Sequence, residues 1–270
     1  MKQRFALTTA HLKWIAIITM LIDHLTAGLL LPYFQMMIRQ DYLWYADGPG
    51  KAVYYWYYIL RGVGRVAFPL FCFMIVEGFW HTRDRRKYLV RLTVFGFLSE
   101  IPFDLAFEHS LFCVDSQNVF FTLAIGLAAI MVLEGILTRL PKVIWRYSLL
   151  IVVIVFFAAL AWAIRTDYGA CGVLLIIVFY LFREKPVYRN LLVIVLLYAT
   201  GYRYDWENYQ FTFQLQSALL EMVGVVSLIL IKFYQGEKGR NLPKYFFYLF
   251  YPVHLLLIAG VSWLWIGFSL

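Results

Sequence analysis

The chain repeatedly stays apolar for the length of a bilayer crossing. A helix needs about 20 mostly apolar residues to span the hydrocarbon core of a membrane. Because every backbone polar group in lipid must be bonded within the protein, such runs predict helices. The sequence therefore predicts an all-α, polytopic transmembrane bundle of about nine spans. They cover residues 13–31, 65–80, 88–107, 119–137, 147–164, 170–182, 190–202, 211–231 and 245–266.

Composition agrees with a membrane protein. Of the 270 residues, 63% are apolar or aromatic and 15% are charged, and the mean hydropathy is +0.71. Soluble domains contain about 45–50% apolar and about 25% charged residues. There is too little polar surface here to cover a water-soluble enzyme, and the composition also excludes a disordered chain, a collagen and a coiled coil. We expect one integral membrane domain over residues 1–270.

Basic residues alternate between the two sides of the predicted spans. The N-terminus and the connections 81–91, 138–146, 183–190 and 232–244 hold 18 of the 24 Lys and Arg residues. An excess of Lys and Arg marks cytoplasmic loops, so the N-terminus is predicted in the cytoplasm and the C-terminus outside. The net charge of +8 is therefore attributed to the Lys and Arg residues that fix the orientation of the chain in the lipid bilayer. It does not predict a surface that binds nucleic acid.

The first apolar run, residues 12–31, is too long for a signal peptide and is expected to stay as an uncleaved helix. Segment 32–64 is rich in Tyr and Trp, which favour the membrane interface. We expect it to form an extracytoplasmic loop with an interfacial helix; a re-entrant span near 52–62 is the alternative.

Ionisable residues lie inside several predicted spans. A charge at membrane depth costs several kcal/mol, so each such residue is a candidate for function, facing a bundle interior or a solvated cavity. We expect these side chains to share one chamber. They are Asp23, His24, Glu77, Glu100, Asp104, Glu221 and His254.

Spacing limits which of these groups share a face. Asp23 and His24 are neighbours and point about 100° apart, so one lines a cavity while the other meets a second helix. A purely structural alternative pairs Asp23 with Arg65 or Arg61. Glu77 and His81 share a helix face, and so do Glu100 and Asp104, four residues apart. Two acids on one face can hold a single proton.

The turn that follows Glu77 is strongly basic. It is either a topology signal or a site where Arg and Lys hold a phosphate-rich ligand. Its residues are Arg83, Arg85, Arg86 and Lys87. The P-loop, G-x-S-x-G, H-E-x-x-H and Rossmann motifs are missing. The three cysteines have no C-x-x-C spacing, so neither a metal site nor a redox pair is expected.

Six stretches of the sequence, which follow one another along nearly the whole chain, resemble the TraX family of membrane proteins. This family is named for a conjugation protein associated with the acetylation of F-type pilin. The most distinctive are RGVGRVAFPLFCFMIVEGFWHTRDRRKYLVRL at 61–92 and FGFLSEIPFDLAF at 95–107. The others are LKWIAIITMLIDH at 12–24, NVFFTLAIGL at 118–127, DYGACGVLLI at 167–176 and KYFFYLFYPVHLLLI at 244–258.

This resemblance implies a bacterial inner-membrane acetyltransferase that moves an acetyl group from cytoplasmic acetyl-CoA to an amine, such as a pilin or other peptide N-terminus, or a similar small acceptor. Acetyl-CoA would dock its phosphates on the basic turn, with Glu77 and His81 close by. His24 is our first choice of general base, since the pKa of an unperturbed histidine lies near neutrality. Asp23 or Glu100 would orient it or stabilise its cation, and His254 is the competing base. Arg65 would bind an acceptor anion or pair with an acid.

Two alternatives remain open. A proton-coupled or lipid-linked transporter would use Glu77, Glu100 and Asp104 as its relay. A non-catalytic scaffold would use the same charges as structural pairs.

Overall fold

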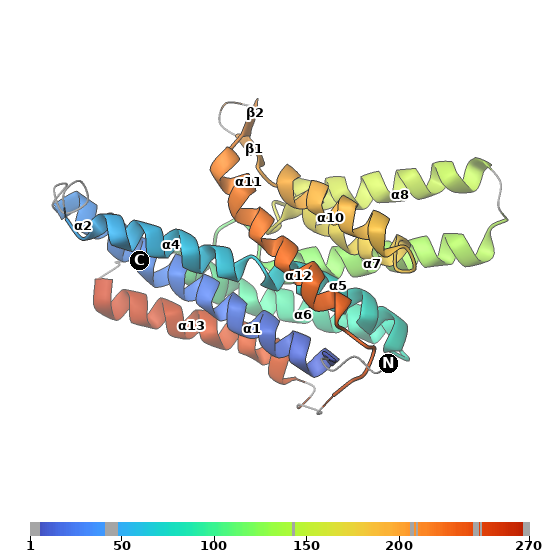
Figure 1. Cartoon of the computed structure of the whole chain (residues 1–270), viewed down its shortest axis with the longest axis horizontal. Coiled ribbons are helices and arrows are strands. Elements are labelled where there is room, and N and C mark those ends of the chain that lie inside the picture. The colour runs from blue at the N-terminus through green and yellow to red at the C-terminus, as the bar shows by residue number, and fades with distance from the viewer. Residues whose placement is uncertain are drawn as a thin grey trace. The chain divides into compact units, whose positions relative to one another are not determined.

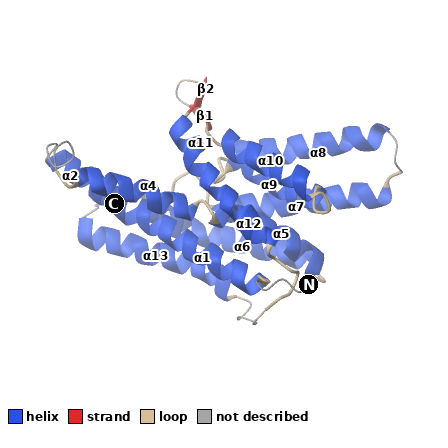
Figure 2. Ribbon diagram, viewed as in Figure 1, coloured by secondary structure: helices blue, strands red, loops and turns tan. Residues whose placement is uncertain are grey.

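A computed structural model describes residues 6–40, 48–141, 144–205, 208, 210–239, 243 and 245–266. Five of the basic residues counted above, Lys2, Arg4, Lys142, Arg240 and Lys244, lie outside this part of the chain. Most of the described chain is helical and almost none of it is sheet, which confirms the all-α membrane bundle (Figure 2). One two-stranded antiparallel hairpin, β1 (Tyr202–Asp205) and β2 (Gln210–Phe213), stands where residues 190–202 and 211–231 were expected to be helical throughout.

Two compact units make up the chain. The first contains Met1–Leu70, Ile101–Phe112 and Leu215–Leu270, and the second contains Phe71–Glu100 and Cys113–Gln214. Two helices, α5 (Ala67–His81) and α6 (Arg85–Phe103), run from one unit into the other.

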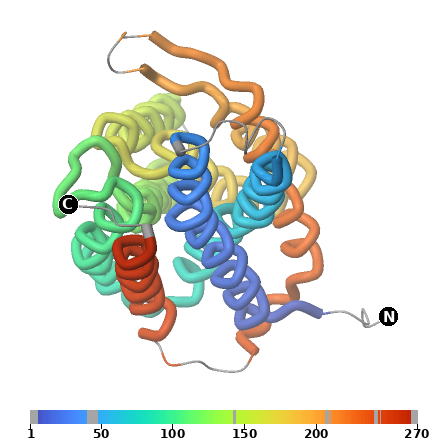
Figure 3. Tube along the Cα trace, turned by 90° about the vertical axis from the view of Figure 1, so that its left-hand side faces the viewer, coloured from blue at the N-terminus to red at the C-terminus, as the bar shows by residue number. Residues whose placement is uncertain are grey.

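In the first unit, α1 (Thr9–Leu25) is the central helix. Thr8 begins it with a capping box, in which the Thr8 hydroxyl accepts from the backbone N–H of His11. The π-helical segment η1 (Thr26–Leu30) and α2 (Leu31–Gln40) continue it without a break. Figure 3 shows α1 between α4 (Gly50–Gly64) and α13 (Phe246–Ile266), and both contact it.

Three further elements complete the first unit. A second π-helical segment, η2 (Asp104–Glu108), extends α6 and packs on α13 and η1. The remaining stretch, α11 (Leu215–Met222), the short 3₁₀ turn η3 (Val223–Val225) and α12 (Val226–Lys232), packs against α4 through α11 and η3.

In the second unit, α9 (Gly169–Leu181) packs against α7 (Val119–Arg139), α8 (Ile144–Ala163) and α10 (Pro186–Ala199). Figure 1 shows α7 and α8 as a long helical hairpin. Gly126 allows α7 and α9 to approach closely, because a Cβ atom there would lie 2.3 Å from Cδ1 of Ile176. Asn118 caps α7 by accepting a hydrogen bond from the backbone N–H of Phe120.

The helices differ from the predicted spans in two respects. Six described segments are long and apolar enough to cross a membrane, α9 and α10 are shorter, and α6 is not among the six, so the count of nine is not confirmed. Four basic residues in the first seven positions of α6 explain its exclusion. Segment 32–64 was expected to be a loop with an interfacial helix. A helix is present at 50–64, but α4 packs along α1 and continues almost directly into α5 as one 32-residue segment, so the expected interfacial loop is wrong for these residues.

Candidate active site

Two histidines meet in the first unit. Nδ1 of His24 on α1 lies 2.7 Å from Nε2 of His254 on α13, and the ring planes are parallel to within 6°. His254 is 5% exposed, and its Nδ1 lies 2.7 Å from the carbonyl oxygen of Phe250, one turn earlier. The sequence therefore found both members of this pair, but only the fold brings residues 230 positions apart into contact.

Aromatic rings hold the imidazoles in place. His24 makes edge-to-face contacts with Phe107 of η2 and Tyr251 of α13, at centroid distances of 5.3 and 5.8 Å. The Phe250 ring stacks on His254 at 4.8 Å. The pair thus sits in an ordered, mostly apolar surround.

The two π-helical segments found among the described residues both border this pair. Segment η1 begins two residues after His24, and η2 carries Phe107. Gly28 of η1 allows close packing on α13, because a Cβ atom there would lie 2.4 Å from Cγ2 of Ile258. Single π-helical turns occur frequently at functional sites, so their position supports this region as the active site.

Asp23 belongs to a buried ion cluster and not to the histidine pair. Its carboxylate accepts hydrogen bonds from Arg61 at 2.5 Å and from Arg65 at 2.9 Å. Arg65 also donates to Glu221 at 2.8 Å. The expectation that Asp23 orients His24 is wrong. The structural alternative holds, because neighbouring helix positions point in different directions.

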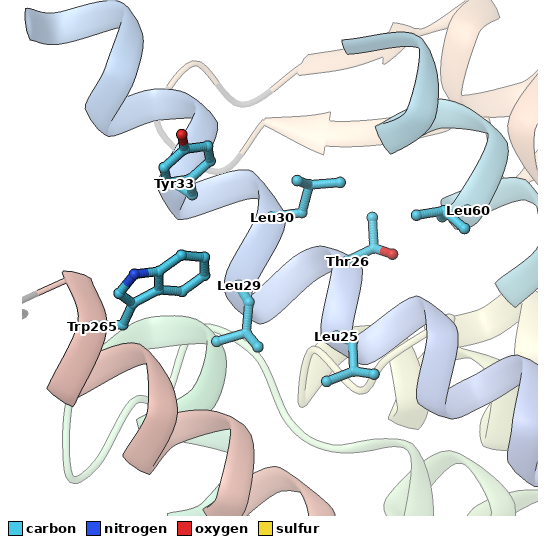
Figure 4. A pocket seen from close by; sticks show the side chains of 7 residues that line it. All are labelled: Leu25, Thr26, Leu29, Leu30, Tyr33, Leu60 and Trp265. Atoms are coloured by element: carbon cyan, nitrogen blue, oxygen red, sulfur yellow. The ribbon is translucent and has the colours of Figure 1, made fainter. Parts of the chain in front are cut away.

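An apolar groove starts at the residue after His24. Its volume is about 270 Å³. Tyr33 and Trp265 stack at 5.6 Å with an interplanar angle of 8°. The Thr26 hydroxyl donates to the carbonyl of Ile22 at 2.7 Å and is therefore already satisfied. Figure 4 shows the lining: Leu25, Thr26, Leu29, Leu30, Tyr33, Leu60 and Trp265.

Glu77 and His81 lie in the second unit, at the end of α5. The Glu77 carboxylate pairs with Arg183 at 3.2 Å, and Nδ1 of His81 lies 2.7 Å from the Glu77 carbonyl oxygen and 3.9 Å from its carboxylate. Arg183 was counted only among the topology signals in the sequence. The chemical need of a buried acid for a cation is the signal that could have found it.

The residues of the basic turn differ in their contacts with the rest of the protein. Arg83 and Arg86 are exposed. The Arg85 guanidinium lies 3.8 Å from the centre of the Phe79 ring. Asp84 pairs with Lys87 at 3.3 Å and accepts a hydrogen bond from its backbone N–H, which lowers the pKa of Asp84. The turn can therefore offer guanidinium groups to phosphates, with Arg85 held over an aromatic ring.

Glu100 also lies in the second unit and has its own partner. It accepts a hydrogen bond from the side chain of Asn118, a residue that the sequence pattern did not single out. Of the seven ionisable groups expected in one chamber, the structure pairs His24 with His254 and joins Asp23 and Glu221 through Arg65. It gives Glu77 and Glu100 separate partners, Arg183 and Asn118, so Glu100 does not orient His24 through any contact described.

Among the described residues, no group of three His, Cys, Asp or Glu side chains could hold a metal ion. None of the three cysteines, Cys72, Cys113 and Cys171, is part of a disulfide bond.

Comparison with known proteins gives two matches. The family model described as TraX protein matches residues 8–262. The "Probable fimbrial assembly protein FimC, serogroup H1" of Dichelobacter nodosus is 31% identical over 272 residues, which cover 97% of this chain and 98% of that protein. No solved structure matches the chain significantly.

Proposed function

Because this membrane protein belongs to the TraX family, we propose that it is an acetyltransferase that moves the acetyl group of cytoplasmic acetyl-CoA to an amine at the end of a pilin or similar peptide. A relative named as a fimbrial assembly protein supports a pilin-related acceptor. We place the protein in the bacterial inner membrane with its N-terminus in the cytoplasm.

The observation that carries this proposal is the His24–His254 pair. An amine attacks a thioester productively when a positioned base removes its proton, and imidazole is suited to this task near neutral pH. A base oriented by a second group is the recurrent arrangement in acyl transfer.

In the proposed reaction the amine nitrogen forms a bond to the acetyl carbon, and the carbon–sulfur bond of the thioester breaks. The histidine pair takes the proton from the amine and returns it to the departing sulfur, which leaves as the free thiol. The pair ends the cycle neutral, and neither a metal nor a covalent acyl-enzyme is required.

The donor would bind through the basic turn. Arg83 and Arg86 are exposed, and guanidinium groups make paired, charge-assisted hydrogen bonds to phosphate. Glu77 would act indirectly, by holding Arg183 at the end of α5, the helix that leads into the basic turn.

The groove that begins at Leu25 would receive the apolar residues that follow the acceptor amine. Along the first helix its lining runs from Leu25 to Tyr33, which is about 12 Å at 1.5 Å per residue. Because this lining is almost wholly apolar, the groove suits the apolar side chains of an acceptor peptide.

The test is transfer of labelled acetyl from acetyl-CoA to peptides with an apolar N-terminus, by the full chain in lipid nanodiscs. We expect turnover by the native protein and a loss of about 10²- to 10⁴-fold in His24→Gln. His11→Gln is the matched control, because glutamine suits the capping box that starts the same helix.

Two results would overturn the proposal. One is native-like turnover in His24→Gln. The other is the absence of transfer together with counterflow of a solute in proteoliposomes that depends on Glu100, which would establish the transporter alternative.

A further inference from the structure

We infer that His254 is a positioning residue that fixes the tautomer of His24, so that Nε2 of His24 is the atom that accepts the proton. This inference rests on the proposed function, because it states which nitrogen of the pair acts as the base. It also replaces Asp23 and Glu100, the groups expected from the sequence to orient His24.

A backbone carbonyl fixes the proton on His254. Nδ1 of His254 lies 2.7 Å from the carbonyl oxygen of Phe250, and a carbonyl oxygen only accepts hydrogen bonds. Nδ1 of His254 therefore carries the proton. In a neutral imidazole one nitrogen is a donor and the other an acceptor, so Nε2 of His254 presents a lone pair.

That lone pair determines the state of His24. Nε2 of His254 and Nδ1 of His24 are 2.7 Å apart, which is a hydrogen-bond distance and requires one proton between them. Since Nε2 of His254 is the acceptor, Nδ1 of His24 is the donor. In neutral His24 the remaining nitrogen, Nε2, then has no proton and is free to take one.

Ring geometry supports the hydrogen bond itself. The two planes are parallel to within 6° and the centroids are 5.0 Å apart, as expected for imidazoles joined edge to edge by an in-plane hydrogen bond. Phe107 and Tyr251 pack around the His24 ring, and a flip of the ring would replace the bonded nitrogen by a carbon and lose this hydrogen bond. The hydrogen bond therefore keeps the same nitrogen toward His254.

The arrangement also stabilises the charged form of the base. When Nε2 of His24 takes the proton, the hydrogen bond from its Nδ1 to His254 becomes charge-assisted and strengthens. The Phe250 carbonyl in turn supports His254. A carboxylate is not needed for this task, and Asp23 is already bonded to Arg61 and Arg65.

The direct test is the tautomer of His24, read by nitrogen NMR on the full chain labelled with ¹⁵N-histidine, with His24→Gln identifying the His24 signals. We expect the native protein to carry the His24 proton on Nδ1. His254→Phe removes the acceptor and should shift His24 toward the Nε2-protonated form, or to a mixture. His254→Gln offers an amide oxygen in place of Nε2 and should restore the native tautomer.

The inference is overturned if native His24 is protonated on Nε2, or if His254→Phe leaves the tautomer unchanged in a folded protein. Acetyl transfer provides the second readout. His254→Phe should lower kcat by about 10- to 100-fold with an unchanged KM for acetyl-CoA, and His254→Gln should recover part of the loss. A chain with the expected tautomers but no transfer activity would refute the proposed function alone.

Discussion

The ion cluster of Asp23, Arg61, Arg65 and Glu221 gives the largest expected effect of a single substitution on stability, and its size can be estimated from the ion-pair distances. Arg65 bonds to Asp23 at 2.9 Å and to Glu221 at 2.8 Å, and its side chain is 9% exposed. Replacing it by methionine preserves most of the side-chain volume and leaves two carboxylates facing one arginine. We therefore expect Arg65→Met to be more destabilising than any other single change in the cluster.

The magnitude follows from opposing terms. An ion pair at 4 Å is worth about 4 kcal/mol at an effective dielectric constant of 20, so two lost pairs remove about 8 kcal/mol. Folding of the variant no longer has to desolvate a guanidinium, and this offsets several kcal/mol of the lost attraction. The net loss in the free energy of unfolding is therefore about 3–5 kcal/mol, as for other buried ion pairs that lose one partner. Arg61 bonds to Asp23 and is 20% exposed, so Arg61→Met should cost less, about 1–3 kcal/mol.

The assay is denaturant-induced unfolding of the purified chain in detergent. Arg203→Met is the matched control, because Arg203 is exposed on β1 and such changes usually stay within about 0.5 kcal/mol. The double variant Arg65→Met with Glu221→Leu should regain part of the stability, since it removes the carboxylate left without its cation. A loss of stability in Arg65→Met no larger than that in Arg203→Met would contradict this role of the ion cluster.

Two further predictions concern the second unit. Gly126→Ala should lower the free energy of unfolding by about 1–3 kcal/mol, because its Cβ would lie 3.2 Å from Cβ and 2.3 Å from Cδ1 of Ile176. Gly135→Ala on the same helix has nothing within 4 Å and should be neutral or stabilising by up to about 1 kcal/mol; equal effects of the two variants would contradict this packing. Asn118→Ala should cost about 2–4 kcal/mol by thermal unfolding, because it removes the cap of α7 and a donor to buried Glu100. A loss below 0.5 kcal/mol would show that neither bond matters.

Much of this protein could be predicted from its sequence because lipid restricts what a backbone can do. Apolar runs of bilayer length require helices, so the fold class followed from composition and length alone. The cost of charge at membrane depth singled out His24, Asp23, Glu77 and His254 before any contact was known. The pairing of Asp23 with Arg61 or Arg65 was also among the alternatives, since a buried acid needs a cation.

Local patterns did not reveal where a helix bends or begins. The aromatic and basic residues of 50–64 look interfacial, yet α4 packs along α1, where Arg61 reaches Asp23. The π-helical turns η1 and η2 have no signature in hydropathy, because one extra residue in a turn changes hydrogen bonding without changing composition.

The sequence by itself determined which side chains are too costly to bury without a purpose, because that cost depends on residue type and depth in the membrane. Only the tertiary structure decided which of them meet. His24 and His254 are 230 residues apart, and no rule of helical spacing links them. Their contact exists because α13 packs on α1, and the Phe250 carbonyl then sets the direction of the hydrogen bond between them.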